Sequence, residues 1–388
     1  MSSSADSKSK SAKSSSDFHR YSLLSPRFWH GMRLRTWLGM LAENRFAFSP
    51  SRIPMGVAIT GFATLNSVLA PVQELFFRRR AERTKIDPPP LFIIGHWRAG
   101  TTLLHELLVL DERHIYPTTY QCFAPHHFLI SEWFVARWLG FVLPERRPMD
   151  NMTAGWDRPQ EDEFALCSLG VPSTYRTMAF PNRPPQYLNY LDLENVNEEQ
   201  VARWRAALQW FLRRVMLRDP RRMILKSPTH TARVKLLAET FPGAKFVHIV
   251  RDPYVLFAST LRMWHSLNQV QGLQVTREER TQAYVLECFD RMYRKYWKER
   301  STIGDDQLCE VRYEDLIADP LGQMRSIYEQ LGLGAFEAVA PRIESYFADR
   351  SDYRTNRYEI PAETRAMLTQ RWGDYLREYG YSAQLAET

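Results

Sequence analysis

Cysteine is scarce in this chain, with four in 388 residues and no Cys-x-x-Cys pair among them. This scarcity argues against a zinc site and against a disulfide framework, and it favours a reducing compartment. The first 17 residues are mostly Ser and Lys, lack the apolar stretch of a signal peptide, and are expected to be disordered. The sequence therefore predicts a cytoplasmic location.

An excess of one charge is also small, because 51 Lys and Arg oppose 44 Asp and Glu, for a net charge of +7. This balance suits an anionic cofactor, an acidic substrate or a membrane surface. Neither an aromatic–basic array nor a zinc-finger spacing is present, so nucleic acid is not a predicted partner. His-x-x-x-His pairs and clustered Asp ligands are missing as well, and no metal site is expected.

A lysine is missing from a loop that otherwise has P-loop spacing. Residues 95–102 read GHWRAGTT after the apolar run Leu91–Ile94, and Thr101 stands where a nucleotide triphosphatase keeps its lysine. A strand, a glycine loop and a helix that begins near Thr101 would aim several backbone N–H groups at one anion. Thr102 adds a second hydroxyl and Arg98 adds a positive fork. The loop predicts a bound phosphate-like group that is not drawn towards Mg²⁺.

Strand and helix patterns alternate after Pro88–Pro90. Strands are expected at 91–94, 223–225, 245–250 and 308–312, and helices at 101–110, from about 231, and from Pro253 past Ser259. Such units build an α/β fold with a doubly wound parallel sheet flanked by helices, as in P-loop NTPases, with ligands at the carboxyl ends of the strands. The loops that hold Arg98, Lys226 and Arg251 would then open on one edge.

The segment that precedes this pattern is expected to form a helical extension over residues 18–84, ahead of a main domain over 85–388. Its basic and aromatic part, up to Phe48, fits an interfacial membrane helix or a helix that packs its aromatics on the main domain. Residues 53–73 contain no charge and are about long enough to span a bilayer, but Pro54, Asn66 and Pro71 weaken that assignment. A buried or membrane-lying helix is preferred, with peripheral membrane contact through residues 18–80 as one alternative.

Three segments in this order resemble the PAPS-dependent sulfotransferases: FIIGHWRAGTT at 92–102, ILKSP at 224–228, and VRDP at 250–253 with Ser259. PQEDE at 159–163 narrows the resemblance to the bacterial-type branch. It covers residues 85–380 and implies transfer of a sulfuryl group from 3′-phosphoadenosine-5′-phosphosulfate (PAPS). The implied acceptor is a hydroxyl or amine of a small molecule, lipid or glycan, and the implied reaction uses no metal.

The resemblance also implies roles for single residues. Arg98, Ala99, Gly100, Thr101 and Thr102 would hold the 5′-phosphosulfate, although Ala99 replaces the family's usual serine. Arg251 and Ser259 would bind the 3′-phosphate. Lys226 would stabilise the negative charge that develops on the leaving oxygen in the transition state.

The acceptor proton needs a base, and several side chains are candidates. Glu161 is the first choice by resemblance, His230 the second, and Glu163 and the pair His126–His127 complete the set. Repulsion among the three acids at 161–163 would raise the pKa of one of them enough to act. The same acids also fit the charged first turn of a helix, and the two interpretations are compatible.

Two other functions are consistent with the loop. A nucleotide-dependent small-molecule kinase could share the fold, although the missing lysine at Thr101 opposes it. A membrane-attached protein that binds a nucleotide without turnover is the second, opposed by Lys226 and the acid cluster.

Overall fold

The computed structural model describes residues 26–138, 155–277, 279–348 and 360–381. The predicted disordered tail, residues 1–17, lies outside the described residues.

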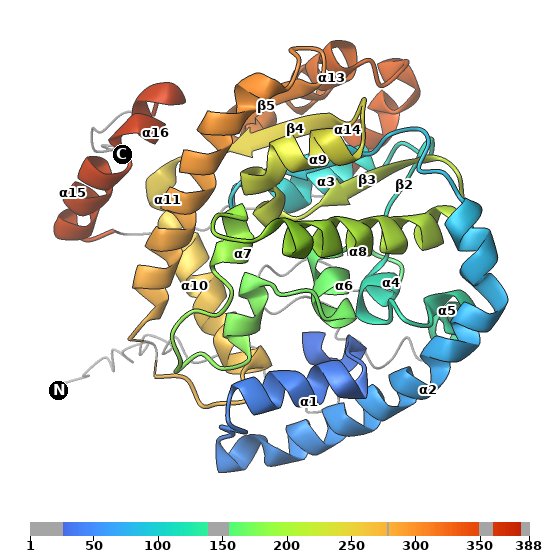
Figure 1. The fold of residues 1–388 in the computed structure, drawn as a ribbon. Coiled ribbons are helices and arrows are strands. Elements are labelled where there is room, and N and C mark those ends of the chain that lie inside the picture. The colour runs from blue at the N-terminus through green and yellow to red at the C-terminus, as the bar shows by residue number, and fades with distance from the viewer. Residues whose placement is uncertain (1–25, 139–154, 278, 349–359, 382–388) are drawn as a thin grey trace, which may run out of the picture.

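A parallel sheet of five strands forms the centre of the fold (Figure 1). The strands are β1 (Leu91–Ile94), β2 (His114–Ile115), β3 (Arg222–Lys226), β4 (Lys245–Val250) and β5 (Leu308–Arg312). Their order in the sheet is β2-β3-β1-β4-β5, so β1 lies between β3 and β4. Ile93 is in register with Lys226, and Ile94 with His248. The loops that follow β1, β3 and β4 therefore leave the sheet side by side at its carboxyl edge, as predicted.

Helices cover both faces of this sheet, with α9 in front and α3 behind in Figure 1. The helices after β1 are α3 (Thr101–Leu108), α4 (Thr119–Phe123), α5 (Phe128–Trp138), α6 (Asp162–Leu169), α7 (Asn189–Asp192), α8 (Glu198–Met216), α9 (Val234–Thr240), α10 (Pro253–Gln271), α11 (Thr281–Glu299), α12 (Tyr313–Ala318), α13 (Pro320–Leu331), α14 (Ala340–Ala348), α15 (Ala362–Arg371) and α16 (Gly373–Glu378). Short 3₁₀ turns are η4 (Thr174–Met178), η5 (Pro228–Arg233), η6 (Arg300–Thr302) and η7 (Phe336–Ala338). The doubly wound α/β architecture predicted from the sequence is confirmed.

Boundaries agree closely for the buried strands and less well for two helices. The helix after β1 ends at Leu108, two residues earlier than predicted, and the one after β3 begins at Val234 and not near Thr231. A 3₁₀ turn, η5, replaces its first turn because several side chains of that segment bond to the start of α6. Strand β2 was not predicted, because two residues are too few for a periodic pattern.

The N-terminal region packs against the main domain as part of one hydrophobic core. It comprises η1 (Phe28–Gly31), α1 (Leu34–Glu43), η2 (Pro50–Arg52) and α2 (Ile53–Arg83). Phe28, Trp29 and Trp37 are buried, whereas Phe46 is exposed. For those three aromatics the packing interpretation holds. Phe28 stacks on Phe164 of α6, with ring centroids 4.0 Å apart.

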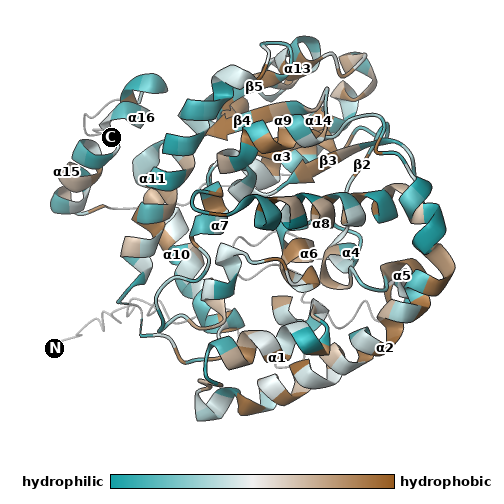
Figure 2. Ribbon diagram, viewed as in Figure 1, coloured by the Kyte–Doolittle hydropathy of each residue, from teal (hydrophilic) through white to brown (hydrophobic). Residues whose placement is uncertain are grey.

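Helix α2 runs along the lower and right-hand edge of the molecule in Figures 1 and 2. Together with η2 it forms a 34-residue segment, Pro50–Arg83, that is long and apolar enough to cross a membrane. Within its most apolar window 33% of the residues are buried inside the protein. One face of the helix therefore packs on the domain, and the remaining surface is turned outward.

Candidate active site

The loop between β1 and α3 is held from several sides. The backbone N–H of Gly95 donates to Thr231 Oγ1 at 2.7 Å, and Thr260 Oγ1 donates to the Trp97 carbonyl at 3.0 Å. Burial lowers the pKa of His96 to about 4, so this ring is neutral near pH 7. Arg98 has a positive φ of 69°, which is uncommon for a residue with a side chain. The surrounding contacts hold the loop in one conformation.

Gly100 cannot be replaced without displacing its neighbours. It caps α3 with φ 111°, and an added Cβ would lie 2.5 Å from Cδ2 of Tyr313. The glycine therefore allows the loop to turn sharply into Thr101 while Tyr313 packs against it. This close approach directs the first N–H groups of α3 towards the carboxyl edge of the sheet.

Two arginines and a serine meet beside this loop. Arg98 Nε donates to Ser259 Oγ at 3.0 Å, and Arg251 Nη1 donates to the Arg98 carbonyl at 3.1 Å. The Arg251 guanidinium lies over the ring of Tyr313, 4.2 Å from its centroid. Its backbone is fixed by Tyr375, whose hydroxyl bonds to both the N–H and the carbonyl of Arg251. Residues predicted from two separate segments thus form one positively charged cluster.

The helix that carries Ser259 begins as its sequence predicts. The Asp252 carboxylate accepts hydrogen bonds from the N–H groups of Tyr254 and Val255, and Pro253 occupies the first helical position. These contacts satisfy N–H groups that the first turn leaves without helical partners. They set the start of α10 and so the position of Ser259 two turns later.

Lys226 ends β3 and bonds to Glu161. Its Nζ lies 2.7 Å from Glu161 Oε1, and the two side chains are 3% and 13% exposed. The second carboxylate oxygen of Glu161 accepts from the Tyr175 hydroxyl at 2.5 Å, and that hydroxyl accepts from Trp97 Nε1 at 2.9 Å. Burial, followed by the nearby Glu161 charge, raises the pKa of Tyr175 well above its usual range, so its hydroxyl stays protonated. A chain of hydrogen bonds therefore links the glycine loop to Lys226.

Asp162 and Glu163 point into the protein and have other partners. Asp162 Oδ2 lies 2.7 Å from His230 Nε2, and Glu163 Oε2 lies 2.7 Å from Arg233 Nη1. Burial alone would raise the pKa of both carboxyls, but the charge and hydrogen bonds of His230 and Arg233 hold them below their usual values. We expected repulsion among the three acids to raise the pKa of one of them. For Asp162 and Glu163 this expectation is wrong, because each carboxylate is paired with a basic side chain of its own.

The remaining candidate bases lie in buried hydrogen-bond networks. His230 and Glu163 have fully buried side chains. His126 Nε2 contacts the Ser168 carbonyl at 3.2 Å, and His127 contacts Asn66 of α2 at 2.9 Å. Burial lowers the pKa values of His126 and His127 to about 3 and about 4. Of the candidates, Glu161 alone has a partly exposed carboxylate beside Lys226.

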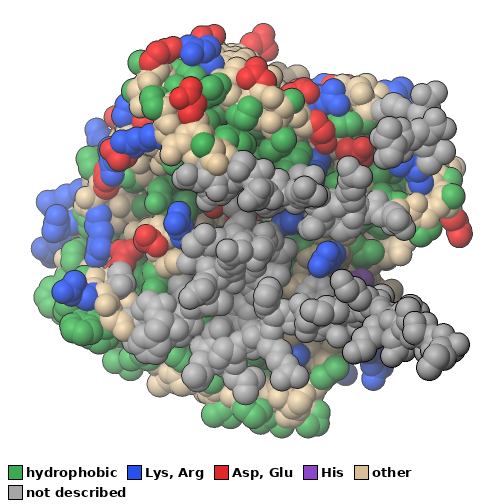
Figure 3. Space-filling view, turned by 180° about the vertical axis from the view of Figure 1, so that it is seen from behind, with side chains coloured by type: hydrophobic (Ala, Val, Ile, Leu, Met, Phe, Trp, Pro, Cys, Tyr) green, Lys and Arg blue, Asp and Glu red, His purple; other side chains and the backbone are tan. Residues whose placement is uncertain are grey.

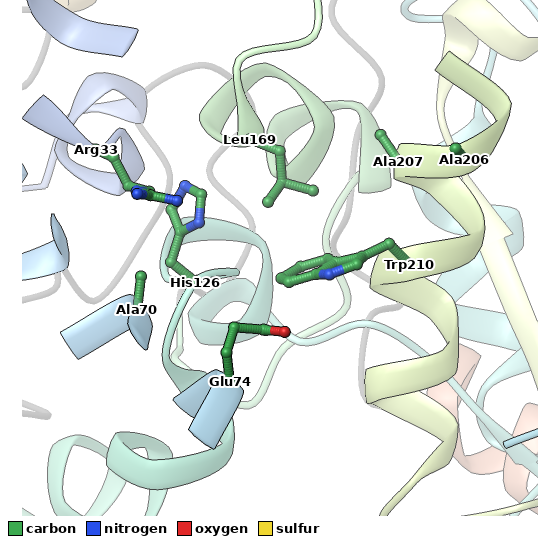
Figure 4. Close-up of a pocket in the computed structure, with 8 residues that line it drawn as sticks. All are labelled: Arg33, Ala70, Glu74, His126, Leu169, Ala206, Ala207 and Trp210. Atoms are coloured by element: carbon green, nitrogen blue, oxygen red, sulfur yellow. The ribbon is translucent and has the colours of Figure 1, made fainter. Parts of the chain in front are cut away.

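A pocket of about 480 Å³ lies between α1, α2, α6 and α8 (Figure 4). Of the candidate bases, only His126 lines it. Arg33, His126, Glu74 and Trp210 line it together with small apolar side chains. Neither Lys226 nor Glu161 is among the residues that line this pocket. Within the described ranges, no group of three His, Cys, Asp or Glu side chains could hold a metal ion.

Comparison with known proteins decides the family. A model described as "Sulfotransferase family" matches residues 89–337. The chain belongs to the sulfotransferase family. A curated relative from Mycobacterium tuberculosis, and the same protein from Mycobacterium bovis, is 45% identical over 378 residues, 97% of each chain. Its name is omega-hydroxy-beta-dihydromenaquinone-9 sulfotransferase Stf3.

Solved sulfotransferases share the fold of this family member. Sulfotransferase STF9 from Mycobacterium avium aligns with a TM-score of 0.65 and 19% identity, covering 86% of this chain and 87% of that one. STF1 from Mycobacterium tuberculosis aligns with a TM-score of 0.60 and 19% identity, covering 88% and 92%. The family resemblance, the fold and the enzyme class predicted from the sequence are confirmed, and the protein is a transferase.

Sequence reasoning missed the tyrosine and the tryptophan that support Glu161. Tyr175 lies in η4, outside every motif, and its contact with Glu161 arises only when η4 packs against the start of α6. Trp97 lies inside the glycine loop, but the motif predicts roles for its polar and glycine neighbours and none for the tryptophan. A tryptophan placed between loop residues predicted to bind an anion was the one available signal, because an indole N–H usually finds a partner when it is buried.

Proposed function

We propose that this sulfotransferase moves a sulfuryl group from PAPS to the hydroxyl of a lipid-like acceptor. The observation that supports this most strongly is the convergence of Arg98, Arg251 and Ser259 beside the Gly95–Thr102 loop, next to the buried pair of Lys226 and Glu161. Arg98, Arg251 and Ser259 suit a donor with several negative charges. Lys226 and Glu161 place a cation and a carboxylate beside that donor.

The residues of the loop fit the donor's charged groups. Gly100 leaves room for a close approach of the backbone, and the N–H groups at the start of α3, with Thr101 and Thr102, suit the 5′-phosphosulfate. Arg251 and Ser259 suit the 3′-phosphate. Since Arg98 contacts Ser259, we place Arg98 between the two groups rather than on the 5′ group alone. Guanidinium forks bind such oxyanions through paired hydrogen bonds. We propose that the transfer uses no metal ion.

Lys226 and Glu161 would divide the work of the transfer. In the reaction a bond forms between the acceptor oxygen and sulfur, and the bond from sulfur to the leaving phosphate oxygen breaks. Glu161 takes the proton of the acceptor hydroxyl, and Lys226 donates a hydrogen bond to the leaving oxygen as its charge grows. The ammonium has three N–H donors, and the bond to Glu161 uses one of them. The same pair is thus suited to both tasks.

The acceptor class rests on the relative named above. Its name states that it acts on a hydroxylated dihydromenaquinone, and it aligns with 97% of this chain, so the N-terminal helices fall within the alignment. We propose a terminally hydroxylated lipid quinone, or a lipid alcohol of similar length, as the acceptor here. Transfer of a labelled sulfuryl group to a hydroxylated prenyl quinone, but not to the same quinone without its hydroxyl, is the expected result.

Calorimetry with 3′,5′-adenosine bisphosphate tests the donor site. We expect the protein to bind this compound more tightly than ATP with Mg²⁺, and Arg251→Ala to weaken binding at least tenfold because it removes a charge-assisted contact. Arg203→Ala is the matched control, since Arg203 is an exposed arginine of α8 paired with Glu199. A preference for ATP with Mg²⁺ would indicate a kinase. Bisphosphate binding without transfer to any hydroxylated lipid would indicate a binding protein.

A further inference from the structure

Helix α2 has its side chains arranged opposite to those of an ordinary surface helix. Its fully buried residues are mostly small or polar, namely Gly56, Ala63, Asn66, Ala70, Gln73 and Ala81, with one large apolar side chain, Ile59. Met55 and Phe77 near its ends also pack on the core but are only partly buried. Its outward face carries large apolar side chains, namely Ile53, Val57, Phe62, Leu65, Val68, Val72, Leu75 and Phe76. A surface helix in water normally shows the reverse pattern, with its polar residues outward.

The inward polar side chains attach α2 firmly to the domain. Asn66 Nδ2 donates to the carbonyls of His30 and Met32, at 2.6 and 2.9 Å, and Gln73 Oε1 accepts from the Leu129 N–H at 2.9 Å. The inward face is therefore the one that packs on the domain, and the apolar outward face is not a core face that has lost its partner. A helix fixed in this way on one side also cannot be surrounded by lipid, which opposes a membrane span.

Charge on α2 is arranged around the apolar face in a way that suits anionic lipid. Glu74 is the only acid between Ile53 and Phe77, and it turns away to pair with Arg214 at 2.8 Å. At the C-terminal end, Arg79 lies three residues after Phe76 and Arg83 seven residues after it, so both continue the same face, and both are exposed.

Helix α5 adds exposed aromatic side chains beside α2. It contacts α2 through the bond between Gln73 and the Leu129 backbone, and its Trp133, Phe134 and Trp138 are exposed on one face. Trp133 is 66% exposed and Leu75 of α2 is 80% exposed. Hydrophobic side chains gather along the lower and left-hand edge in Figure 3, with Lys and Arg side chains beside them on the left. Tryptophan prefers the boundary between lipid tails and headgroups.

We infer that the outward face of α2, together with Trp133, Phe134 and Trp138 of α5, docks on the surface of a membrane that contains anionic lipids. The apolar side chains enter the headgroup–acyl boundary, with α2 lying in the plane of the membrane, and Arg79 and Arg83 contact lipid phosphates. This narrows the sequence-based expectation, which allowed a membrane-lying helix over residues 53–73 and also an interfacial helix in the basic and aromatic segment before residue 48. There, Phe28, Trp29 and Trp37 are used for packing.

Flotation of the full chain with lipid vesicles tests the docking surface. The protein should float with vesicles of phosphatidylcholine and phosphatidylglycerol, float less with phosphatidylcholine alone, and be released by raised salt. Leu75→Glu/Phe76→Glu should reduce the bound fraction more than tenfold, because both side chains are exposed in solution and need no repacking. Ile317→Glu is the matched control: this exposed isoleucine lies on α12, which packs against β5. The control should float like the wild type.

Other outcomes overturn the proposal. Failure of the wild type to float with either vesicle excludes membrane docking. Resistance to extraction at alkaline pH shows that α2 spans the bilayer. A dimer in light scattering that the double substitution dissociates identifies the face as an interface between copies. Binding of 3′,5′-adenosine bisphosphate, measured on each variant, verifies the fold, and because it does not involve lipid it separates failure of this inference from failure of the proposed reaction.

Discussion

At the residue scale, three consecutive acids have different partners, and the first has a different role from the other two. Glu161 faces Lys226 and Tyr175, whereas Asp162 and Glu163 face His230 and Arg233 inside the protein. The two inner pairs fix the start of α6 against the segment after β3. Because that attachment sets the distance between Glu161 and Lys226, the two buried acids position the pair for which we propose the transfer chemistry.

Glu161→Gln should lower kcat by about 10²- to 10⁴-fold, the usual contribution of a general base. The amide keeps the shape of the side chain but cannot take the acceptor proton. Binding of 3′,5′-adenosine bisphosphate, measured by calorimetry, should change by less than threefold, since Glu161 is not among the residues proposed for the donor. Steady-state kinetics with a labelled donor provide kcat.

Glu199→Gln is the control for this substitution, because Glu199 is an exposed acid on α8. It should leave both kcat and binding unchanged. Wild-type turnover in Glu161→Gln would show that another group removes the proton and would contradict the role given to Glu161.

The sequence was sufficient to predict which residues converge at this site, but not how their side chains are arranged within it. Arg98, Lys226 and Arg251 follow strands that meet at one sheet edge, so their convergence could be predicted from topology. Which of the acids at 161–163 faces the opening could not, because three consecutive residues at a helix start point in different directions. Tyr175 depends on a long-range contact that no local pattern encodes.

At the scale of elements, the turn from β1 into α3 requires glycine at position 100. Gly100→Ala should destabilise the protein by roughly 1–3 kcal/mol, the usual cost of holding a residue with a side chain in strained backbone. Its Cβ would also press on Tyr313, which supports Arg251, so donor binding should fall more than tenfold. Chemical denaturation and calorimetry measure the two effects.

Gly39→Ala provides the comparison. Gly39 lies within α1, and a Cβ added there meets nothing within 4 Å. Alanine should stabilise the helix by up to about 1 kcal/mol and leave donor binding unchanged. Equal behaviour of the two variants would show that the loop tolerates a side chain at Gly100.

Elements differ in how well the sequence defines them. Strands β1, β4 and β5 were predicted within their observed bounds. For β1 and β4 the reason is that buried strands of a parallel sheet appear as short, mainly apolar runs, whereas the edge strand β5 alternates buried and less buried residues. Helix α2 shows the limit of composition: an uncharged stretch indicates a helix but not which side faces the protein. That side is fixed by Asn66 and Gln73, whose partners, His30 of η1 and Leu129 of α5, lie far from them in the sequence.

At the scale of the whole molecule, Glu310 joins parts of the chain that are far apart in sequence. This residue of β5 bonds to His248 of β4 at 2.8 Å, to Tyr296 of α11 at 2.8 Å, and to Tyr379, which follows α16, at 3.3 Å. Burial favours its neutral form, but the bond to His248 and the other partners lower the pKa of Glu310 to about 2. Ionised Glu310 therefore links two strands, a long helix and the C-terminal segment.

The sign of this pKa shift determines how stability should depend on pH. Because the pKa of Glu310 is lower in the folded state than its ordinary value of 4.5, folding favours the ionised form. The stabilisation is complete above about pH 5, decreases as the pH falls below 4.5, and is lost by about pH 2.

Glu310→Gln should lower the free energy of unfolding at pH 7 by about 1–2 kcal/mol, a value reduced for the partial exposure of the carboxylate. Urea denaturation from pH 7 to pH 3 should show the difference between wild type and variant shrinking towards acid, and a difference that stays constant would mean that the charge of Glu310 does not hold these segments together.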